Sequence, residues 1–351
     1  MYNNNIHTKK TQIFMKIFDK KIISLITGAV FIALILKNID INKSLEAVKH
    51  LNFFYVLLMI PAYYCAFLFR ALRWKTILSE KKEIKLTSFL NSLLRGWLVN
   101  CVVPARGGEL YRAHFFGKKE DLSRVTILAS IVLERIFDGL ILFLILFLLA
   151  SFVYSSKKFF GIAVAAGIIF VGTFLSLLLI SKFYKNAFIK EKFKKFFAPT
   201  PNTRIKNFLS KILNKITGTV NSFIDGLEIF NSPVLILKTF FITLLVWLCE
   251  GLSLFVLIKG FGYSIGILGS LFVLSIIAFI SLIPAGPGSL GTLQWGFIIA
   301  LGFFNISKET AFAVSIISQL FSVITVSLGS LFFMATEHFD IKEKDYTSLE
   351  N

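Results

Sequence analysis

The chain has 351 residues, of which 56% are hydrophobic and 15% aromatic, and its mean hydropathy is +0.75. A soluble globular protein holds about 45–50% apolar residues with glycine included, so this composition excludes an ordinary soluble domain. The net charge of +18 would favour nucleic-acid binding in a soluble protein. Here the basic residues lie between long apolar runs, and we expect no nucleic acid among the partners.

The apolar runs set the predicted architecture. They lie at 22–36, 53–69, 139–153, 159–180, 234–258, 265–283 and 311–334. A helix needs about 20 mostly apolar residues to cross a hydrocarbon core about 30 Å thick. The sequence therefore predicts an all-α, polytopic transmembrane helical bundle. Its expected parts are a basic tail (1–21), a first transmembrane half (22–181), a basic amphipathic segment (182–233), a second transmembrane half (234–335) and a tail (336–351).

The charge distribution predicts the orientation of this bundle. The lysine-rich tail 1–21 precedes an apolar run, but no A-x-A-like cleavage site follows, so we expect an uncleaved first span. Lysine and arginine concentrate on the cytoplasmic side of membrane proteins. Placing tail 1–21, the basic stretches 70–85 and 106–124, and segment 182–215 on that side puts both termini in the cytoplasm. The expected location is the cell inner (plasma) membrane.

Segment 86–103 predicts a first re-entrant hairpin. It is a poor span, because Asn91, Arg95 and Asn100 interrupt it, and a full crossing would place 106–124 outside. A hairpin that enters and leaves on one face resolves both difficulties. Non-helical backbone is tolerated at membrane depth only where it is buried in protein or lines a wet cavity. The expected hinge residues are Pro104, Gly107, Gly108 and Glu109.

A second break, at 284–291, repeats the Pro-Ala spacing of 104–108 without its charges. It predicts a second hairpin over 265–304, with hinge residues Pro284, Gly286, Gly288 and Gly291. The preceding spans, 53–69 and 234–258, run in opposite directions in the predicted topology, which favours an inverted repeat. Coincidence between two short Pro/Gly breaks is the alternative. The letters also match GxGxxG, but no short strand precedes them, so dinucleotide binding is excluded.

Charged residues inside the apolar runs are the strongest local signal. Glu134, Arg135 and Asp138 lie about ten residues into a predicted span, roughly 15 Å deep. A charge at the membrane centre costs about 2.5–3.5 kcal/mol on insertion scales, so these residues should be paired. They form a predicted intramembrane ion cluster together with Glu250, for which Arg95 or Arg135 is a candidate partner. The cluster either fixes helix packing or forms part of a polar substrate pathway.

Further basic residues have two expected roles. Arg70, Arg73 and Trp74 follow the run 53–69 and are typical of interfacial anchors, with snorkelling arginines beside an interfacial tryptophan. Arg95, Arg106 and Arg112 lie around the first hairpin and are candidates for binding lipid phosphate. The amphipathic stretch 205–227 either lies on anionic inner-leaflet lipid or packs on the bundle as a connector.

Cysteine and histidine usage predicts neither a disulfide nor a metal site. Cys65, Cys101 and Cys249 lie in apolar segments without a CxxC pair, which favours buried free thiols. No histidine stands at a metal-ligand spacing. We therefore expect no metal ion and no cofactor.

Four motifs, taken together, carry a resemblance to a known family. They are Arg70-x-x-Arg73-Trp74, Asn100-x-x-x-Pro104-x-Arg106-x-Gly108-Glu109-x-x-Arg112, Glu134-Arg135-x-x-Asp138 and Pro284-x-Gly286-x-Gly288-x-x-Gly291. In this order they resemble the lysylphosphatidylglycerol synthase transmembrane-domain, or flippase-like, family over about residues 20–335.

The resemblance implies an inner-membrane protein that handles lipids. In the family's best-known branch this domain flips aminoacylated phosphatidylglycerol, and other relatives are linked to polyprenyl- or dolichol-linked sugars. The chain departs from that branch in lacking a soluble aminoacyltransferase domain. It also carries Thr292-Leu293-Gln294-Trp295 where many relatives have an acid. Both departures leave the lipid class open.

Three functions follow from these observations. The first is a lipid translocase for an anionic or zwitterionic phospholipid or a polyprenyl-linked lipid. The second is a membrane-embedded headgroup or glycosyl transferase, with Glu109 or Asp138 as base. The third is a scaffold subunit of a lipid-synthesis complex. Membrane lipids are the expected partners, and a soluble or membrane transferase or a second copy of the chain are the protein partners to test.

Overall fold

The computed structural model describes residues 30–104, 106–184, 217–283 and 286–349, with side chains as far as Thr336. These residues form helices joined by short turns, with no strand among them, which confirms the predicted all-α class. The predicted tail 1–21, the start of the run 22–36, and most of the basic segment at 185–216 lie outside the described residues. The helices are α2 Ile41–Lys49, α3 Phe53–Ile77, α4 Leu86–Val102, α5 Gly107–Glu120, α6 Arg124–Leu148, η1 Leu149–Val153, α7 Lys157–Tyr184, η2 Glu228–Asn231, α10 Pro233–Gly260, α11 Gly266–Ile280, η3 Pro287–Ser289, α12 Thr292–Gly302 and α13 Lys308–Leu349.

Helix length separates the membrane spans from the shorter elements. Within the described chain, five segments are long and apolar enough to cross a membrane: Phe53–Ile77, Arg124–Val153, Lys157–Phe183, Pro233–Gly260 and Lys308–Thr336. At 1.5 Å per residue, a helix of about 25 residues is roughly 38 Å long and covers the hydrocarbon core. Helices α4, α5, α11 and α12 have only 17, 14, 15 and 11 residues. The molecule is therefore a multi-pass integral membrane protein.

The chain divides into two compact units, whose boundaries fall within α3, α4, α5 and α10. Unit 1 comprises 1–64, 93–111 and 249–351, and unit 2 comprises 65–92 and 112–248. Each unit is therefore assembled from segments that are far apart in the sequence.

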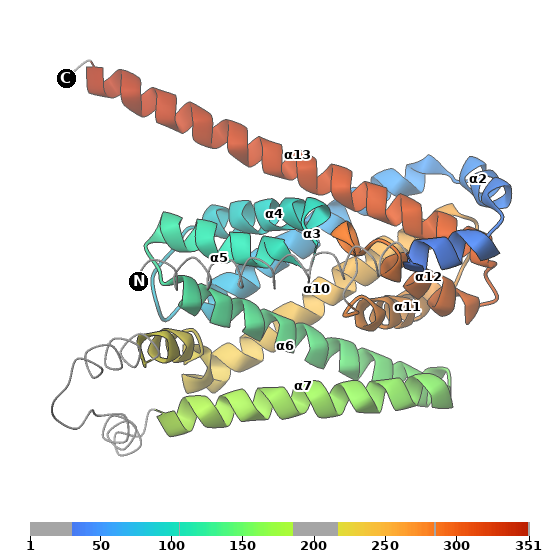
Figure 1. Cartoon of the computed structure of the whole chain (residues 1–351), viewed down its shortest axis with the longest axis horizontal. Coiled ribbons are helices and arrows are strands. Elements are labelled where there is room, and N and C mark those ends of the chain that lie inside the picture. The colour runs from blue at the N-terminus through green and yellow to red at the C-terminus, as the bar shows by residue number, and fades with distance from the viewer. Residues whose placement is uncertain (1–29, 105, 185–216, 284–285, 350–351) are drawn as a thin grey trace, which may run out of the picture. The chain divides into compact units, whose positions relative to one another are not determined.

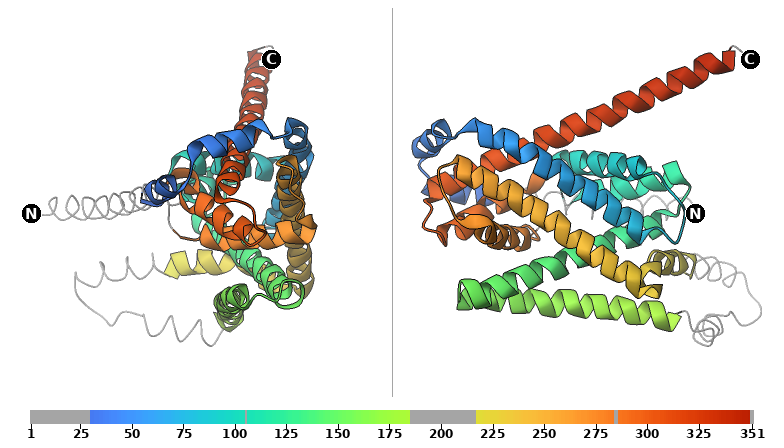
Figure 2. Two further views of the ribbon diagram at one scale, coloured as in Figure 1. Left: turned by 90° about the vertical axis from the view of Figure 1, so that its right-hand side faces the viewer. Right: turned by 180° about the vertical axis from the view of Figure 1, so that it is seen from behind.

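In unit 2, α6 and α7 form an antiparallel pair (Figures 1 and 2). Glycines allow the close approach, because a Cβ on Gly139 would overlap the Phe170 ring and one on Gly167 would lie 2.6 Å from the Phe143 ring. Helix α6 also contributes to a buried cluster, against which Phe174, Leu177 and Leu178 of α7 pack, and which comprises Ile77, Ala129, Leu133, Phe137, Leu227, Ile229 and Phe230. Leu227, Ile229 and Phe230 thus pack on the bundle, while the choice between the two interpretations of the amphipathic stretch 205–227 stays open.

Helices α4 and α5 form a hairpin, in which the end of α5 lies beside the start of α4. Ser88, near the start of α4, donates a hydrogen bond to the Glu120 carboxylate at the end of α5. Lys82, in the turn after α3, donates to the Glu120 carbonyl at 3.0 Å. The predicted hairpin therefore has the expected chain path, whereas its re-entry into the membrane stays a prediction.

In unit 1, α11 and α12 form a second short helix pair. The Phe272 ring of α11 lies 5.2 Å from the Phe303 ring, which follows α12. Near the turn, a Cβ on Gly296 would lie 3.4 Å from the Ile277 Cα. The two helices are therefore antiparallel, as the hairpin over 265–304 requires, and the inverted repeat stays a prediction.

The glycines at the two breaks differ in backbone conformation. At the first break the left-handed backbone belongs to Arg106, with φ 56°, and not to a glycine. Gly107 and Gly108 begin α5, where a Cβ on Gly108 would overlap the Gly96 carbonyl oxygen of α4. At the second break Gly288 and Gly291 have φ values of 62° and 91°, which glycine adopts at little cost. Gly286 has φ −58°, and Pro284 lies outside the described residues.

The hairpin path predicts which ends of the helices share a side of the membrane. Single cysteines at Ser79 and Lys118, in a chain with Cys65, Cys101 and Cys249 replaced, should react with an impermeant thiol reagent from one and the same side. A cysteine at Lys157, beyond the far end of α6, should react from the other side. Labelling of Lys118→Cys from the side of Lys157→Cys would contradict the re-entrant hairpin.

The close approach at Gly108 predicts that an alanine substitution there lowers stability, whereas one at an uncrowded glycine does not. Gly108→Ala should destabilise the protein by about 1–3 kcal/mol, because the new methyl group collides with the α4 backbone. Gly161→Ala on α7 should be neutral or stabilising, because nothing lies within 4 Å of its Cβ position and alanine favours helix. Thermal unfolding in detergent measures both, and equal melting temperatures would contradict the packing argument.

Candidate functional site

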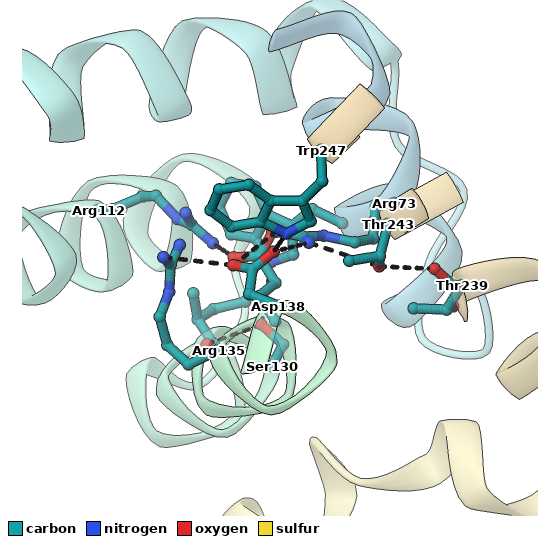
Figure 3. A network of polar contacts seen from close by, with 11 residues as sticks. Arg73, Arg112, Ser130, Arg135, Asp138, Thr239, Thr243 and Trp247 are labelled. Atoms are coloured by element: carbon teal, nitrogen blue, oxygen red, sulfur yellow. Dashed lines mark hydrogen bonds and ion pairs between the residues drawn. The ribbon is translucent and has the colours of Figure 1, made fainter. Parts of the chain in front are cut away.

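Five charged residues on three helices of unit 2 form one connected network, shown in Figure 3. Helix α6 contributes Glu134, Arg135 and Asp138, α3 contributes Arg73, and α5 contributes Arg112. Helix α6 is otherwise a strongly apolar span, so these charges would be costly there without partners. We call these five residues the ion cluster.

Glu134 holds the first two ion pairs of the cluster. Its side chain is 0% exposed, and its Oε2 pairs with the Arg112 guanidinium, which is also buried. Its Oε1 lies 3.6 Å from Nη2 of Arg73, whose side chain is likewise 0% exposed. Glu134 therefore joins α5 to α3 through α6.

Asp138, one turn further along α6, continues the network. Its Oδ1 accepts a hydrogen bond from Arg73 Nη1 at 2.5 Å and another from Trp247 Nε1 of α10 at 3.1 Å. Its Oδ2 lies 3.3 Å from Arg135 Nη1. Charges thus alternate along the cluster in the order Arg112, Glu134, Arg73, Asp138 and Arg135, so each carboxylate lies between two guanidinium groups.

Arg73 and Trp74, the predicted interfacial anchors, are buried within the protein, and their depth in the membrane stays a prediction. Both are 0% exposed, because α3 continues past them to Ile77 and this part of the helix faces α6. Arg70, one turn earlier, is also buried, and its guanidinium lies 5.5 Å from the Phe67 ring centroid. The sequence held a signal for a further partner, because Glu134 and Asp138 are two carboxylates in the middle of α6 and Arg135 is the one cation beside them, and a buried carboxylate needs a paired cation.

The aromatic ring of Trp74 packs against the Arg112 guanidinium, which pairs with Glu134. The Arg112 guanidinium carbon lies 3.9 Å from the Trp74 ring centroid, within the range of a cation–π contact. Trp74 Nε1 donates to Ser130 Oγ at 2.9 Å, which fixes the ring against α6. The rings of Phe89 and Phe116 lie 5.1 and 4.4 Å from Trp74. Stacking and pairing together determine the direction of the Arg112 side chain.

The other predicted site residues belong to unit 1. Arg95, Arg106, Glu109 and Glu250 lie there, together with the hinge glycines. The structure brings the two breaks together, since Arg106 Nη2 donates to the Ser281 carbonyl at 3.4 Å. The Asn100 side chain accepts from the Gly108 amide at 2.7 Å and caps the start of α5.

An amide network that the sequence did not indicate holds the second break. Gln294 Oε1 accepts from the Gly291 amide at 2.7 Å, and Gln294 Nε2 donates to Gln319 Oε1 of α13 at 2.7 Å. Gln319 Nε2 in turn donates to the Gly288 carbonyl at 2.8 Å. Two neutral side chains thus satisfy the free backbone groups of the break, as a low-dielectric interior requires.

Metal-ligating and thiol groups are dispersed. Across the described ranges no three histidine, cysteine or acidic side chains gather into a group that could hold a metal ion. The three cysteines are free, but Cys65 is exposed and Cys101 and Cys249 are half-buried, which differs from the full burial expected. A cysteine on the outer surface of an apolar helix faces the hydrocarbon, which the sequence pattern alone does not distinguish from a protein core.

The helical fold and the charges inside its spans define a multi-pass integral membrane protein with a polar interior network. The model of the family described as "Lysylphosphatidylglycerol synthase TM region" matches residues 21–329. The chain belongs to this family.

Curated relatives extend the likeness over most of the chain. A UPF0104 membrane protein of Methanocaldococcus jannaschii is 25% identical over 329 residues, covering 88% of this chain and 93% of the relative. A second one from the same organism is 26% identical and covers 70% of this chain and 97% of itself. One from Methanothermobacter thermautotrophicus is 22% identical, with coverage of 88% and 93%. No solved structure matches the chain significantly.

The order of pairs in the ion cluster predicts unequal effects of two arginine substitutions. Arg73→Leu should destabilise the protein by about 3–5 kcal/mol, because it removes a buried partner from both carboxylates. Arg135→Leu should cost less, because Asp138 keeps Arg73 and Trp247. Thermal unfolding of purified protein in detergent measures both changes.

A double substitution controls this comparison. Arg73→Leu combined with Asp138→Leu should recover much of the lost stability, since Glu134 keeps Arg112. A single Arg73→Leu variant as stable as the parent protein would show that the cluster does not hold the three helices together.

Proposed function

We propose that this chain is a lipid translocase that moves an anionic or zwitterionic phospholipid, or a polyprenyl-linked lipid, between the leaflets of the inner membrane. The proposal includes a cytoplasmic N-terminus and C-terminus. The observation that carries it is the ion cluster, because charges buried inside candidate spans are costly and usually mark a polar pathway or a substrate site.

The physical reason is the cost of moving a headgroup through hydrocarbon. A bare ion at the bilayer centre is prohibitive unless it meets fixed counter-charges on its way. The ion cluster offers alternating guanidinium and carboxylate groups within unit 2. Arg112 is the proposed phosphate contact in that unit, while Arg95 and Arg106 are proposed contacts in unit 1. The two breaks at 104–109 and 284–291 are the proposed hinges, since broken helices are a common feature of transporter sites.

Family membership supports the same proposal. The family is named for the synthesis of a lipid, lysylphosphatidylglycerol, so we infer a lipid substrate for this chain as well. A headgroup transferase or a scaffold that docks a partner transferase are the alternatives, and the assay below distinguishes them.

The test is lipid movement in liposomes that contain only the purified protein. Fluorescent phospholipid and polyprenyl-phosphate lipids should become accessible to a membrane-impermeant quencher faster than in protein-free liposomes. The double variant Arg112→Gln with Glu134→Gln removes both charges of a buried pair while leaving groups that form hydrogen bonds. It should fold and lose about tenfold or more in rate, a change of about 1.4 kcal/mol.

A matched pair outside the cluster is the control. Lys81 and Glu228 lie 2.8 Å apart, and Lys81→Gln with Glu228→Gln should leave the rate unchanged. Consumption of the lipid with release of a modified product would instead establish a transferase. Neither movement nor modification with any lipid would leave the scaffold function.

A further inference from the structure

The short helix α2 has three different faces. One face packs on the protein, since Ser44 is only 5% exposed and α2 lies beside the first part of α13 (Figure 1). On the adjoining face Ile41 and Leu45, one turn apart, are 53% and 56% exposed. The third face is polar and exposed, with Asn42, Lys43, Glu46 and Lys49. An apolar face and a polar face are therefore both open beside the face that packs.

Helix α2 lies where three membrane spans begin or end. The turn 50–52 joins it to the start of α3, and in that turn the Asn52 amide donates to the carbonyl of Gly260, the last residue of α10, at 3.0 Å. Before α2, the Asn38 carbonyl accepts from Lys308, the first residue of α13. With nine residues, α2 is about 14 Å long and too short to cross the hydrocarbon core. It therefore lies at the boundary of the membrane.

The exposed apolar surface continues along the chain on both sides of α2. Leu34, before it, is 56% exposed, and Phe53 and Leu57, at the start of α3, are 60% and 62% exposed. Helix α3 is a candidate span, so its outer apolar side chains face the hydrocarbon. Ile41 and Leu45 lie between these two segments, and lying in the interface would remove their side chains from water.

The charges of α2 balance, which distinguishes attraction by hydrocarbon from attraction by anionic headgroups. Its two acids are Asp40, the N-cap residue, and Glu46. Its two bases are Lys43 and Lys49, so the helix with its cap has no net charge. The surface potential of an anionic leaflet attracts segments with net positive charge, and it does not favour this helix.

We propose that α2 is an interfacial helix, which lies in the plane of the membrane with Ile41 and Leu45 inserted among the acyl chains. Its partner is the hydrocarbon of the leaflet that contains the start of α3, whatever the headgroup. Because the residues that flank α2 bond to Gly260 and Lys308, this helix anchors the ends of α10 and α13 at the level of the interface. The inference does not depend on lipid movement, so it stands or fails separately from the translocase.

Spin labels on single cysteines test this placement in phosphatidylcholine liposomes. The full chain, with its three native cysteines replaced, is labelled at Ile41→Cys or Leu45→Cys. Asn42→Cys and Glu46→Cys, on the polar face of the same helix, are the matched controls. Electron paramagnetic resonance measures collisions with oxygen, which concentrates in hydrocarbon, and with a nickel chelate, which stays in water.

The two faces should give opposite results. The ratio of oxygen to nickel collisions at Leu45 should exceed the ratio at Glu46 several-fold, with a label depth of about 5–10 Å into the headgroup/acyl boundary. Equal ratios at Leu45 and Glu46 would place α2 in water and overturn the proposal. Few collisions with either reagent at Leu45 would show that protein, such as a second copy of the chain, covers this face, and would overturn it as well.

Liposomes of different charge test the kind of attraction. Anionic lipid or added salt should leave the ratio at Leu45 unchanged, because the charges of α2 balance. Insertion that occurs only in anionic liposomes at low salt would overturn the assignment of hydrocarbon as the partner.

A last measurement uses the unaltered protein, so that it does not depend on the folding of any variant. A hydrophobic diazirine reagent, dissolved in the bilayer and activated by light, should label Ile41 or Leu45, as read by peptide mass spectrometry. Asn42 and Glu46 should stay unlabelled. Labelling of the start of α3 without any labelling of α2 would contradict the proposal.

Discussion

The pairing of Arg73 with two carboxylates of α6 is the interaction on which the architecture of unit 2 depends. A guanidinium group is always charged, so the free-energy cost of burying its charge cannot be relieved by loss of a proton, as it can for a lysine. Arg73 must therefore find counter-charges inside the bundle, and the carboxylates of Asp138 at 2.5 Å and Glu134 at 3.6 Å provide them. This requirement fixes both the rotation of α3 and its depth against α6.

Arg112 extends the same constraint to α5. Its charge is compensated by Glu134, and its flat face is covered by the Trp74 ring at 3.9 Å. The helix that carries it is only 14 residues long, too short to cross the hydrocarbon alone, and it is held by partners on α3, α4 and α6. The buried arginine of this short helix is compensated by Glu134 of α6 and covered by Trp74 of α3.

The sequence predicted the elements better than the contacts between them. Hydropathy identified the long spans, because about 20 apolar residues are needed to cross the hydrocarbon core whatever the fold. Polar residues marked 86–103 as a poor span, and α4, with 17 residues, is an unbroken helix that is not among the candidate spans. The hairpin path of α4 and α5 is visible in the bonds from Ser88 and Lys82 to Glu120. The sequence also indicated that Glu134, Arg135 and Asp138 need partners. It did not indicate Arg73 as the partner, because helical spacing reports neighbours on one helix and says nothing about which other helix lies opposite. The same limit hid the network of Gln294 and Gln319, whose members are 25 residues apart on different helices.

The predicted hinge residues of the first break do not include the residue whose backbone is left-handed. Glycine is the residue that adopts a left-handed backbone at little cost, so Gly107 and Gly108 were the natural candidates, yet Arg106 adopts it with φ 56°. The conformation costs a non-glycine residue about 1–2 kcal/mol, and the surrounding bonds provide compensation: Arg106 reaches the Ser281 carbonyl, and Asn100 caps the Gly108 amide. Gly108 serves instead to let α5 approach the α4 backbone. Turning the chain at an arginine, rather than at one of the two glycines beside it, places a cation at the break while leaving the glycines free for helix packing. The strained backbone at Arg106 is thus linked to the position of its charge.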